Sequence, residues 1–125
     1  RAVSGAGIAT YVYLLFGTPP EDEAAACRTL EFIAGNREYV DFLNLSIFNL
    51  PKNSPEALCL NTFDFSEGDL SLYQGFVHPR GWDRKRVRRF LETRFRRDPD
   101  IARIVRRDTP SFPSNHAPFF TGNIL

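Results

Sequence analysis

The side chains best suited to catalysis or metal binding in this sequence of 125 residues are two histidines and two cysteines. His78 and His116 each lie among turn-forming and aromatic residues, and Cys27 and Cys59 stand far apart along the chain. This spacing matches no zinc knuckle, no disulfide framework and no catalytic triad. We therefore expect both cysteines to be reduced and buried, and each histidine to order a loop.

Arginine side chains could hold phosphate groups, and they are concentrated in the last part of the sequence. Residues 1–79 contain 4 basic and 10 acidic residues, whereas residues 80–125 contain 12 basic and 5 acidic ones. Such a cluster can bind RNA or an acidic protein. Because the arginines alternate with an apolar stripe and with acidic residues such as Glu92, the pattern favours a solvated helix face or one paired with an acidic neighbouring domain. Nucleic-acid binding is the alternative that the pattern leaves open.

A second candidate site is the turn Gly17–Glu21, which follows a strongly apolar segment. α/β proteins bind ligands at the carboxyl ends of parallel strands, but Pro19 and Pro20 remove N–H donors that a phosphate cradle needs. The turn is therefore either a plain helix cap or a site for a neutral or aromatic ligand group. Polar residues on or after the next apolar segment either form local hydrogen bonds or line a pocket. They are Asn44, Ser46 and Asn49.

A strand, a helix and a second strand must position these residues. The run over 8–16 is nearly all apolar, with β-branched and aromatic residues, as in a strand covered on both faces of a parallel sheet. Thr18 and Glu21 have the spacing of a capping box, which predicts a helix over 19–34. Alternating apolar and polar residues predict a second strand over 41–48. A crossover helix makes the two strands parallel, so the predicted class is α/β with a βαβ unit.

The remainder of the chain is predicted to be loop-rich and then helical. Between residues 50 and 79, prolines and glycines predict loops, a short turn of helix and a hairpin-like segment. Asp83 and Asp98 are suitable N-cap residues, and the apolar spacing behind them predicts helices over 83–97 and 99–107.

The composition is that of one folded domain. Hydrophobic residues make up 42% and charged residues 25% of the chain, which is typical of globular proteins. The longest apolar run is much shorter than the ~20 residues that a membrane helix needs, and no signal-peptide pattern opens the chain. We expect a cytoplasmic protein without a membrane partner.

Three stretches of the sequence are Leu-Phe-Gly-Thr-Pro-Pro-Glu-Asp-Glu at 15–23, Arg-Thr-Leu at 28–30 and Phe-Asn-Leu-Pro at 48–51. Together they resemble the late part of the barrel of radical S-adenosylmethionine (SAM) enzymes. The stretches 78–84 and 115–120 are similar to the C-terminal part of the group that often carries a cobalamin-binding domain. The resemblance implies a βαβ unit from a partial (β/α) TIM-like barrel, followed by a loop-rich and helical C-terminal extension. The implied boundaries are 1–50 for the barrel portion and 51–125 for the extension.

The resemblance also implies a place for the cofactor. In that family a strand near the end of the barrel gives apolar and backbone contacts to the adenine of SAM, and these fall by position on Leu15, Phe16 and Gly17. Pro20 stands where the family pattern has a glutamate, and Glu21 follows one position later. The family's Cys-x-x-x-Cys-x-x-Cys loop, whose thiolates hold a 4Fe–4S cluster, is absent. The chain alone therefore has no implied catalytic or metal-binding residue, holds no cofactor by itself and would be inactive.

The absence of both a cluster loop and an initiator methionine predicts that the chain is the C-terminal piece of a longer oxidoreductase-like enzyme. That parent would hold a 4Fe–4S cluster and SAM and, in part of the group, cobalamin. The partner of this piece is then the rest of the parent polypeptide, and the isolated piece is expected to form a homo-oligomer through 8–16 or 41–48. The alternative is a small stand-alone module that binds RNA or an acidic protein through its arginine-rich helices.

Overall fold

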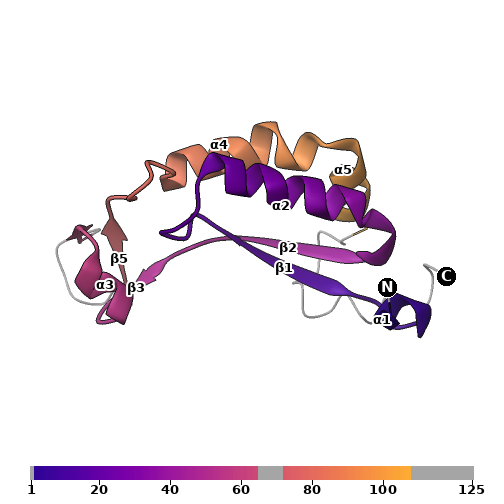
Figure 1. Cartoon of the computed structure of the whole chain (residues 1–125), viewed down its shortest axis with the longest axis horizontal. Helices are drawn as coiled ribbons and strands as arrows, with labels where there is room; N and C mark the ends of the chain where they lie inside the picture. The colour runs from indigo at the N-terminus through magenta and orange to yellow at the C-terminus, as the bar shows by residue number, and fades with distance from the viewer. Residues whose placement is uncertain (1, 65–71, 108–125) are drawn as a thin grey trace.

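The computed structural model describes residues 2–64 and 72–107, which form a mixed α/β fold with two small sheets (Figure 1). In chain order the elements are α1 (Ala2–Gly5), β1 (Tyr11–Phe16), α2 (Glu23–Gly35), the 3-10 helix η1 (Arg37–Tyr39), β2 (Phe42–Ile47), β3 (Leu50–Pro51), α3 (Pro55–Cys59), β4 (Thr62–Phe63), β5 (Tyr73–Phe76), α4 (Arg84–Thr93), the 3-10 helix η2 (Phe95–Arg97) and α5 (Pro99–Val105). One sheet consists of β1 and β2, and the other has the order β3-β5-β4.

The predicted βαβ unit is confirmed, because β1 and β2 pair in parallel and α2 connects them. The register places Tyr13 opposite Asn44 and Leu15 opposite Ser46. The expectation that the first strand is covered on both faces is wrong for the described residues: α2, α4 and α5 all lie on one face of the sheet (Figure 1). On the other face, Tyr13 is 63% and Leu15 is 53% exposed. This face is open towards the carboxyl ends of the strands, whereas at their amino ends Phe42, opposite Tyr11, is only 2% exposed.

Helix α2 begins at Glu23 rather than directly after Thr18. Pro19, which would be the first helical residue, precedes Pro20, and residues before proline avoid the helical region. Residues 18–21 instead form a turn that is closed by a hydrogen bond of 2.9 Å from the Glu21 N–H to the Thr18 carbonyl. Asp22 is the N-cap, and its carboxylate accepts from the Ala25 N–H. The predicted capping box between Thr18 and Glu21 is therefore wrong.

The C-terminal helices begin where the sequence predicts. The Asp83 carboxylate accepts from the Arg86 N–H at 2.8 Å, and the Asp98 carboxylate accepts from the Asp100 N–H at 3.0 Å. The predicted helix that runs to residue 97 is divided into α4 and η2. Local capping therefore fixes the start of both α4 and α5.

One apolar core joins the first part of the chain to the C-terminal helices. Phe16, the last residue of β1, packs against Phe90 and Phe95, with ring centroids 6.1 and 5.3 Å away. Residues 1–50 and 51–125, the two predicted portions, both contribute to this core. Its buried members are Phe16, Ala26, Ile33, Val40, Leu43, Trp82, Val87, Phe90, Leu91, Phe95, Ile101 and Ile104.

The second sheet is antiparallel and lies at the end of the molecule that also carries α3 (Figure 1). Ser54 caps α3, which confirms the predicted short helix in this region. Both thiols are free; Cys27 is half-buried, but Cys59 is exposed because α3 lies away from the core. The expectation of a buried thiol is thus wrong for Cys59. His116 and the rest of residues 108–125 lie outside the described residues, as do residues 65–71.

Within the described ranges, no helix has the length and apolar character needed to cross a membrane.

Candidate functional site

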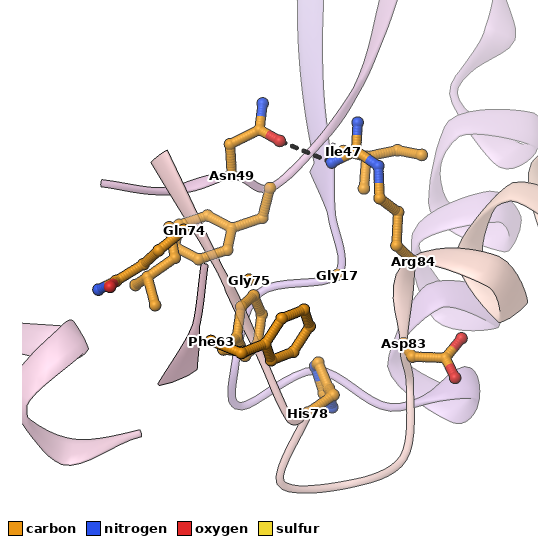
Figure 2. Close-up of a pocket in the computed structure, with 12 residues that line it drawn as sticks. Gly17, Ile47, Asn49, Phe63, Gln74, Gly75, His78, Asp83 and Arg84 are labelled. Atoms are coloured by element: carbon orange, nitrogen blue, oxygen red, sulfur yellow. Dashed lines mark hydrogen bonds between the residues drawn. The ribbon is translucent and has the colours of Figure 1, made fainter. Parts of the chain in front are cut away.

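A cleft of about 90 Å³ opens at the carboxyl ends of β1 and β2, next to β5 (Figure 2). This is the edge at which parallel sheets bind ligands. The wall after β2 is formed by residues 47–50, and the facing wall by Gln74, Gly75 and Phe76 of β5. The residues that line the cleft are therefore brought together from segments far apart in the sequence.

Aromatic rings form much of the cleft. Phe48 and Phe76 meet edge to face, with ring centroids 5.9 Å apart. The Phe63 ring lies directly over the backbone of Gly75, so closely that a Cβ at this position would run into the ring. Gly75 therefore allows β4 to bring an aromatic ring into the cleft.

The polar residues that line the cleft are Asn49, Gln74, His78, Asp83 and Arg84. The Asn49 side-chain oxygen accepts a hydrogen bond of 2.6 Å from the Arg84 guanidinium, as Figure 2 shows. Asn44 and Ser46 are not at the cleft: the Ser46 hydroxyl donates to the Asn44 side-chain oxygen at 3.1 Å, on β2 itself. Of the three polar residues singled out in the sequence, the structure brings only Asn49 to the cleft.

The three residues implied as contacts to SAM have different surroundings. Gly17 lines the cleft. The Phe16 side chain is buried in the core under α4, and the Leu15 side chain is exposed on the uncovered face of the sheet. Of these three residues, only Gly17 lines the cleft. Phe63, Gln74 and other residues of the second sheet also line it, and no local pattern in the sequence predicts this.

Gly17→Ala is expected to lower the free energy of unfolding by about 2 kcal/mol, measured by urea denaturation. Gly17 has a φ of +79°, where alanine is strained by about 1–2 kcal/mol. A Cβ at this position would also lie 3.3 Å from Val87 Cγ2 in the core. Gly35→Ala is the matched control, because a Cβ at this position would meet nothing within 4 Å beyond its chain neighbours and the backbone of its own helix, and it should be neutral or slightly stabilising. Equal losses in the two variants would contradict this assignment.

The loop before α4 is fastened to the turn after β1. His78 is buried, and its Nε2 lies 3.0 Å from the Thr18 carbonyl. Its Nδ1 accepts from the N–H groups of Arg80 and Trp82, both at 3.2 Å. These contacts fit the tautomer that carries its proton on Nε2. His78 thus orders a loop, as the sequence predicts.

The Glu21 carboxylate completes this connection. One of its oxygens accepts two hydrogen bonds, one from the Gly17 N–H and one of 3.1 Å from the Trp82 indole N–H. Burial raises the pKa of Glu21 above its ordinary value of 4.5, although the hydrogen bonds from Gly17 and Trp82 act in the opposite direction. Glu21 is therefore a positioning residue that holds the turn at residues 17–21 against Trp82, in the loop before α4.

An ion pair lies beside this network. The Arg80 guanidinium is 2.6 Å from the Asp22 carboxylate. The hydrogen bond from the Ala25 N–H, and then the Arg80 contact, hold the pKa of Asp22 below its usual range. Asp22 thus caps α2 and also binds the loop that precedes α4.

The described part of the chain holds no group of three or more His, Cys, Asp or Glu residues placed to bind a metal ion. Cys27 lies on α2 and Cys59 on α3, and they are the only two cysteines of the sequence. A cluster that needs three thiolates does not fit these residues. A comparison of the chain with known protein families, with curated proteins and with solved structures finds no match.

Proposed function

We propose that this chain forms part of the barrel wall of a radical SAM enzyme, in which the cleft receives part of the SAM molecule. The observation that carries the proposal is the one-sided βαβ unit with a cleft at the carboxyl ends of its strands. In a (β/α) barrel, helices cover the outer face of the strands while neighbouring strands enclose the inner face, and ligands bind at the carboxyl ends. The fold and the position of the cleft both suit this arrangement.

The uncovered face of the sheet supports a larger parent structure. Tyr13 and Leu15 are exposed there, and the register sets them opposite Asn44 and Ser46. Further strands of a barrel would cover Tyr13 and Leu15. Self-association of the isolated chain through this face stays a prediction.

The size and lining of the cleft favour one portion of a ligand rather than a whole one. Its volume of about 90 Å³ is far below the roughly 300–1,000 Å³ of pockets that enclose a complete small molecule. Phe48, Phe63 and Phe76 offer aromatic surface, and Asn49 and Gln74 offer amide groups. This combination suits a planar heterocycle such as adenine, with the rest of the site supplied by the parent.

The 4Fe–4S cluster of such a parent must be held by other residues of the polypeptide. SAM bound to a cluster supplies the radical chemistry of these enzymes. The residues of this chain would bind and orient the nucleoside end and exclude water from it.

The first test is the coding sequence before Arg1, where we expect a Cys-x-x-x-Cys-x-x-Cys loop. The longer protein, reconstituted with iron and sulfide, should show the absorption of a 4Fe–4S cluster and bind SAM. The 125-residue chain alone should form no stable cluster, because it has two cysteines. An upstream sequence without three closely spaced cysteines would overturn the proposal.

A variant of the longer protein tests the cleft itself. Gly75→Ala should displace the Phe63 ring and weaken SAM binding roughly tenfold, as expected for a misfit of one methyl group in an apolar pocket. Cluster absorption should not change, because Gly75 lies in the cleft and contributes no thiolate. Gly35→Ala on α2 is the matched control and should leave SAM binding intact. If Gly75→Ala also binds SAM normally, the ligand does not occupy this cleft.

A further inference from the structure

A basic groove lies along α4 next to the start of α2, outside the cleft described above. Its volume is about 360 Å³, and its lining includes Arg86, Arg89 and Arg94. Thr93 and the carboxylate of Glu23 also line it. Three guanidinium groups and one carboxylate give the groove a net positive charge, which suits an anionic ligand.

Two of the three guanidinium groups are available to a ligand. Arg94 lies 3.3 Å from the Glu23 carboxylate and stacks over Phe90, 5.7 Å from the ring centre. Among the described residues, the guanidinium groups of Arg86 and Arg89 make no hydrogen bond or ion pair. Their spacing of three residues places them on one stripe of α4. Both residues also line the groove.

The groove lies on a strongly basic segment of the chain. Between residues 84 and 107 the sequence has eleven basic residues and three acidic ones, and ten of the basic residues are arginines. All eleven basic side chains are exposed. A field of this extent attracts a polyanion rather than a single small ion.

The surface lacks the features of a protein-docking site. No large hydrophobic residue between 84 and 107 is exposed; in the described residues, the exposed ones lie in other segments, such as Tyr13 and Leu15 on β1. Protein interfaces have an apolar core that is depleted of charged residues. Interfaces with nucleic acids are polar and strongly positive. The composition of this face therefore favours a nucleic acid over an acidic protein.

We propose that the exposed basic side chains of α4, η2 and α5, with Arg86 and Arg89 as phosphate contacts in the groove, bind the phosphodiester backbone of a nucleic acid. Guanidinium contacts to phosphate carry no base information, so binding is independent of sequence. The proposal rests on charge and exposure at the helices and does not depend on the barrel function. Evidence against SAM binding would leave it intact.

The test is fluorescence anisotropy of the 125-residue chain with a labelled RNA duplex and a DNA duplex of the same length. The logarithm of the binding constant should fall linearly with the logarithm of salt concentration, with a slope of about −0.9 for each phosphate contact. The double variant Arg86→Gln/Arg89→Gln should bind roughly tenfold more weakly at about 50 mM salt and lower the slope by about two. Equal binding of the two duplexes assigns the site to the shared backbone, and preference for one of them identifies the source of the phosphates.

Arg28→Gln is the matched control, because Arg28 is exposed on α2 and does not line the groove. It removes one charge without touching the proposed surface, and it should change the affinity much less than either Arg86→Gln or Arg89→Gln alone. Circular dichroism should show that all variants remain folded, since the replaced side chains are exposed. Equal effects of all single variants, no salt dependence, or displacement of the duplex by polyglutamate at equal charge concentration would overturn the proposal.

Discussion

Phe95→Ala is expected to lower the free energy of unfolding by about 3–5 kcal/mol, the range measured for removal of a large buried ring. Phe95 is fully buried in η2, and the centroid of its ring lies 5.3 Å from that of Phe16 and 6.1 Å from that of Phe90. The variant loses the burial of the ring and leaves a cavity between β1 and α4. A loss of this size is a large part of the total stability of a small domain.

Urea denaturation, followed by circular dichroism and by the fluorescence of Trp82, measures this loss. Phe32→Ala is the matched control: Phe32 lies on α2 and is 67% exposed, so its replacement should change the free energy by no more than about 0.5 kcal/mol. Because one core contains Phe16 and Phe95, both probes should report the same transition. Equal losses in the two variants, or two separate transitions in the native chain, would contradict the shared core.

Glu21→Ala should destabilise the chain by about 2–3 kcal/mol at neutral pH, because it leaves the Gly17 N–H and the buried Trp82 indole N–H without an acceptor. Glu21→Gln should be nearly neutral. Both hydrogen bonds end on the same carboxylate oxygen, and the amide oxygen of glutamine can accept both. The comparison separates the role of the acceptor from that of the charge.

The pH dependence gives a second readout of Glu21. Because burial raises the pKa of Glu21 above 4.5, the native chain binds this proton more tightly than the unfolded chain. The stability that protonated Glu21 contributes is fully present below the unfolded pKa and is lost as pH rises through the higher native pKa. Glu21→Gln has no such proton. The free energy of unfolding of Glu21→Gln minus that of the native chain should therefore increase as pH rises through the native pKa of Glu21.

Denaturation curves of the native chain and Glu21→Gln across the acid range measure this difference. Glu31→Gln is the control, since Glu31 is exposed on α2. If the free energy of unfolding of Glu21→Gln minus that of the native chain stays constant, or falls, as pH rises, the pKa of Glu21 is not raised.

The sequence by itself determined the elements that depend on neighbouring residues. The parallel strands and the crossover between them follow from an apolar run, a helix of sufficient length and a second alternating run. Asp83 and Asp98 cap α4 and α5 as predicted, because a capping bond joins a side chain to an N–H only two or three residues away. The order of these elements is therefore encoded locally.

Local spacing failed where two interactions competed for the same residue. Thr18 and Glu21 have the spacing of a capping box, yet Asp22 caps α2 and Glu21 turns to Gly17 and Trp82. The two consecutive prolines disfavour a helix that starts directly after Thr18, and so disfavour the capping box. The Glu21 carboxylate accepts from the Trp82 indole N–H instead. The proline effect can be read from the sequence, but the indole is 61 residues away.

Only the tertiary structure decided where the cleft lies and which face of the sheet is covered. Phe63 and Gln74 meet residues 47–50 because β5 pairs with both β3 and β4, and no periodicity in the sequence specifies that pairing. The nearly continuous apolar run of β1 suits burial on either face. The packing of Phe16 against Phe90 and Phe95 placed the helices on one of them. Contacts between distant segments depend on the shapes that meet when the chain folds, and local sequence patterns do not record those shapes.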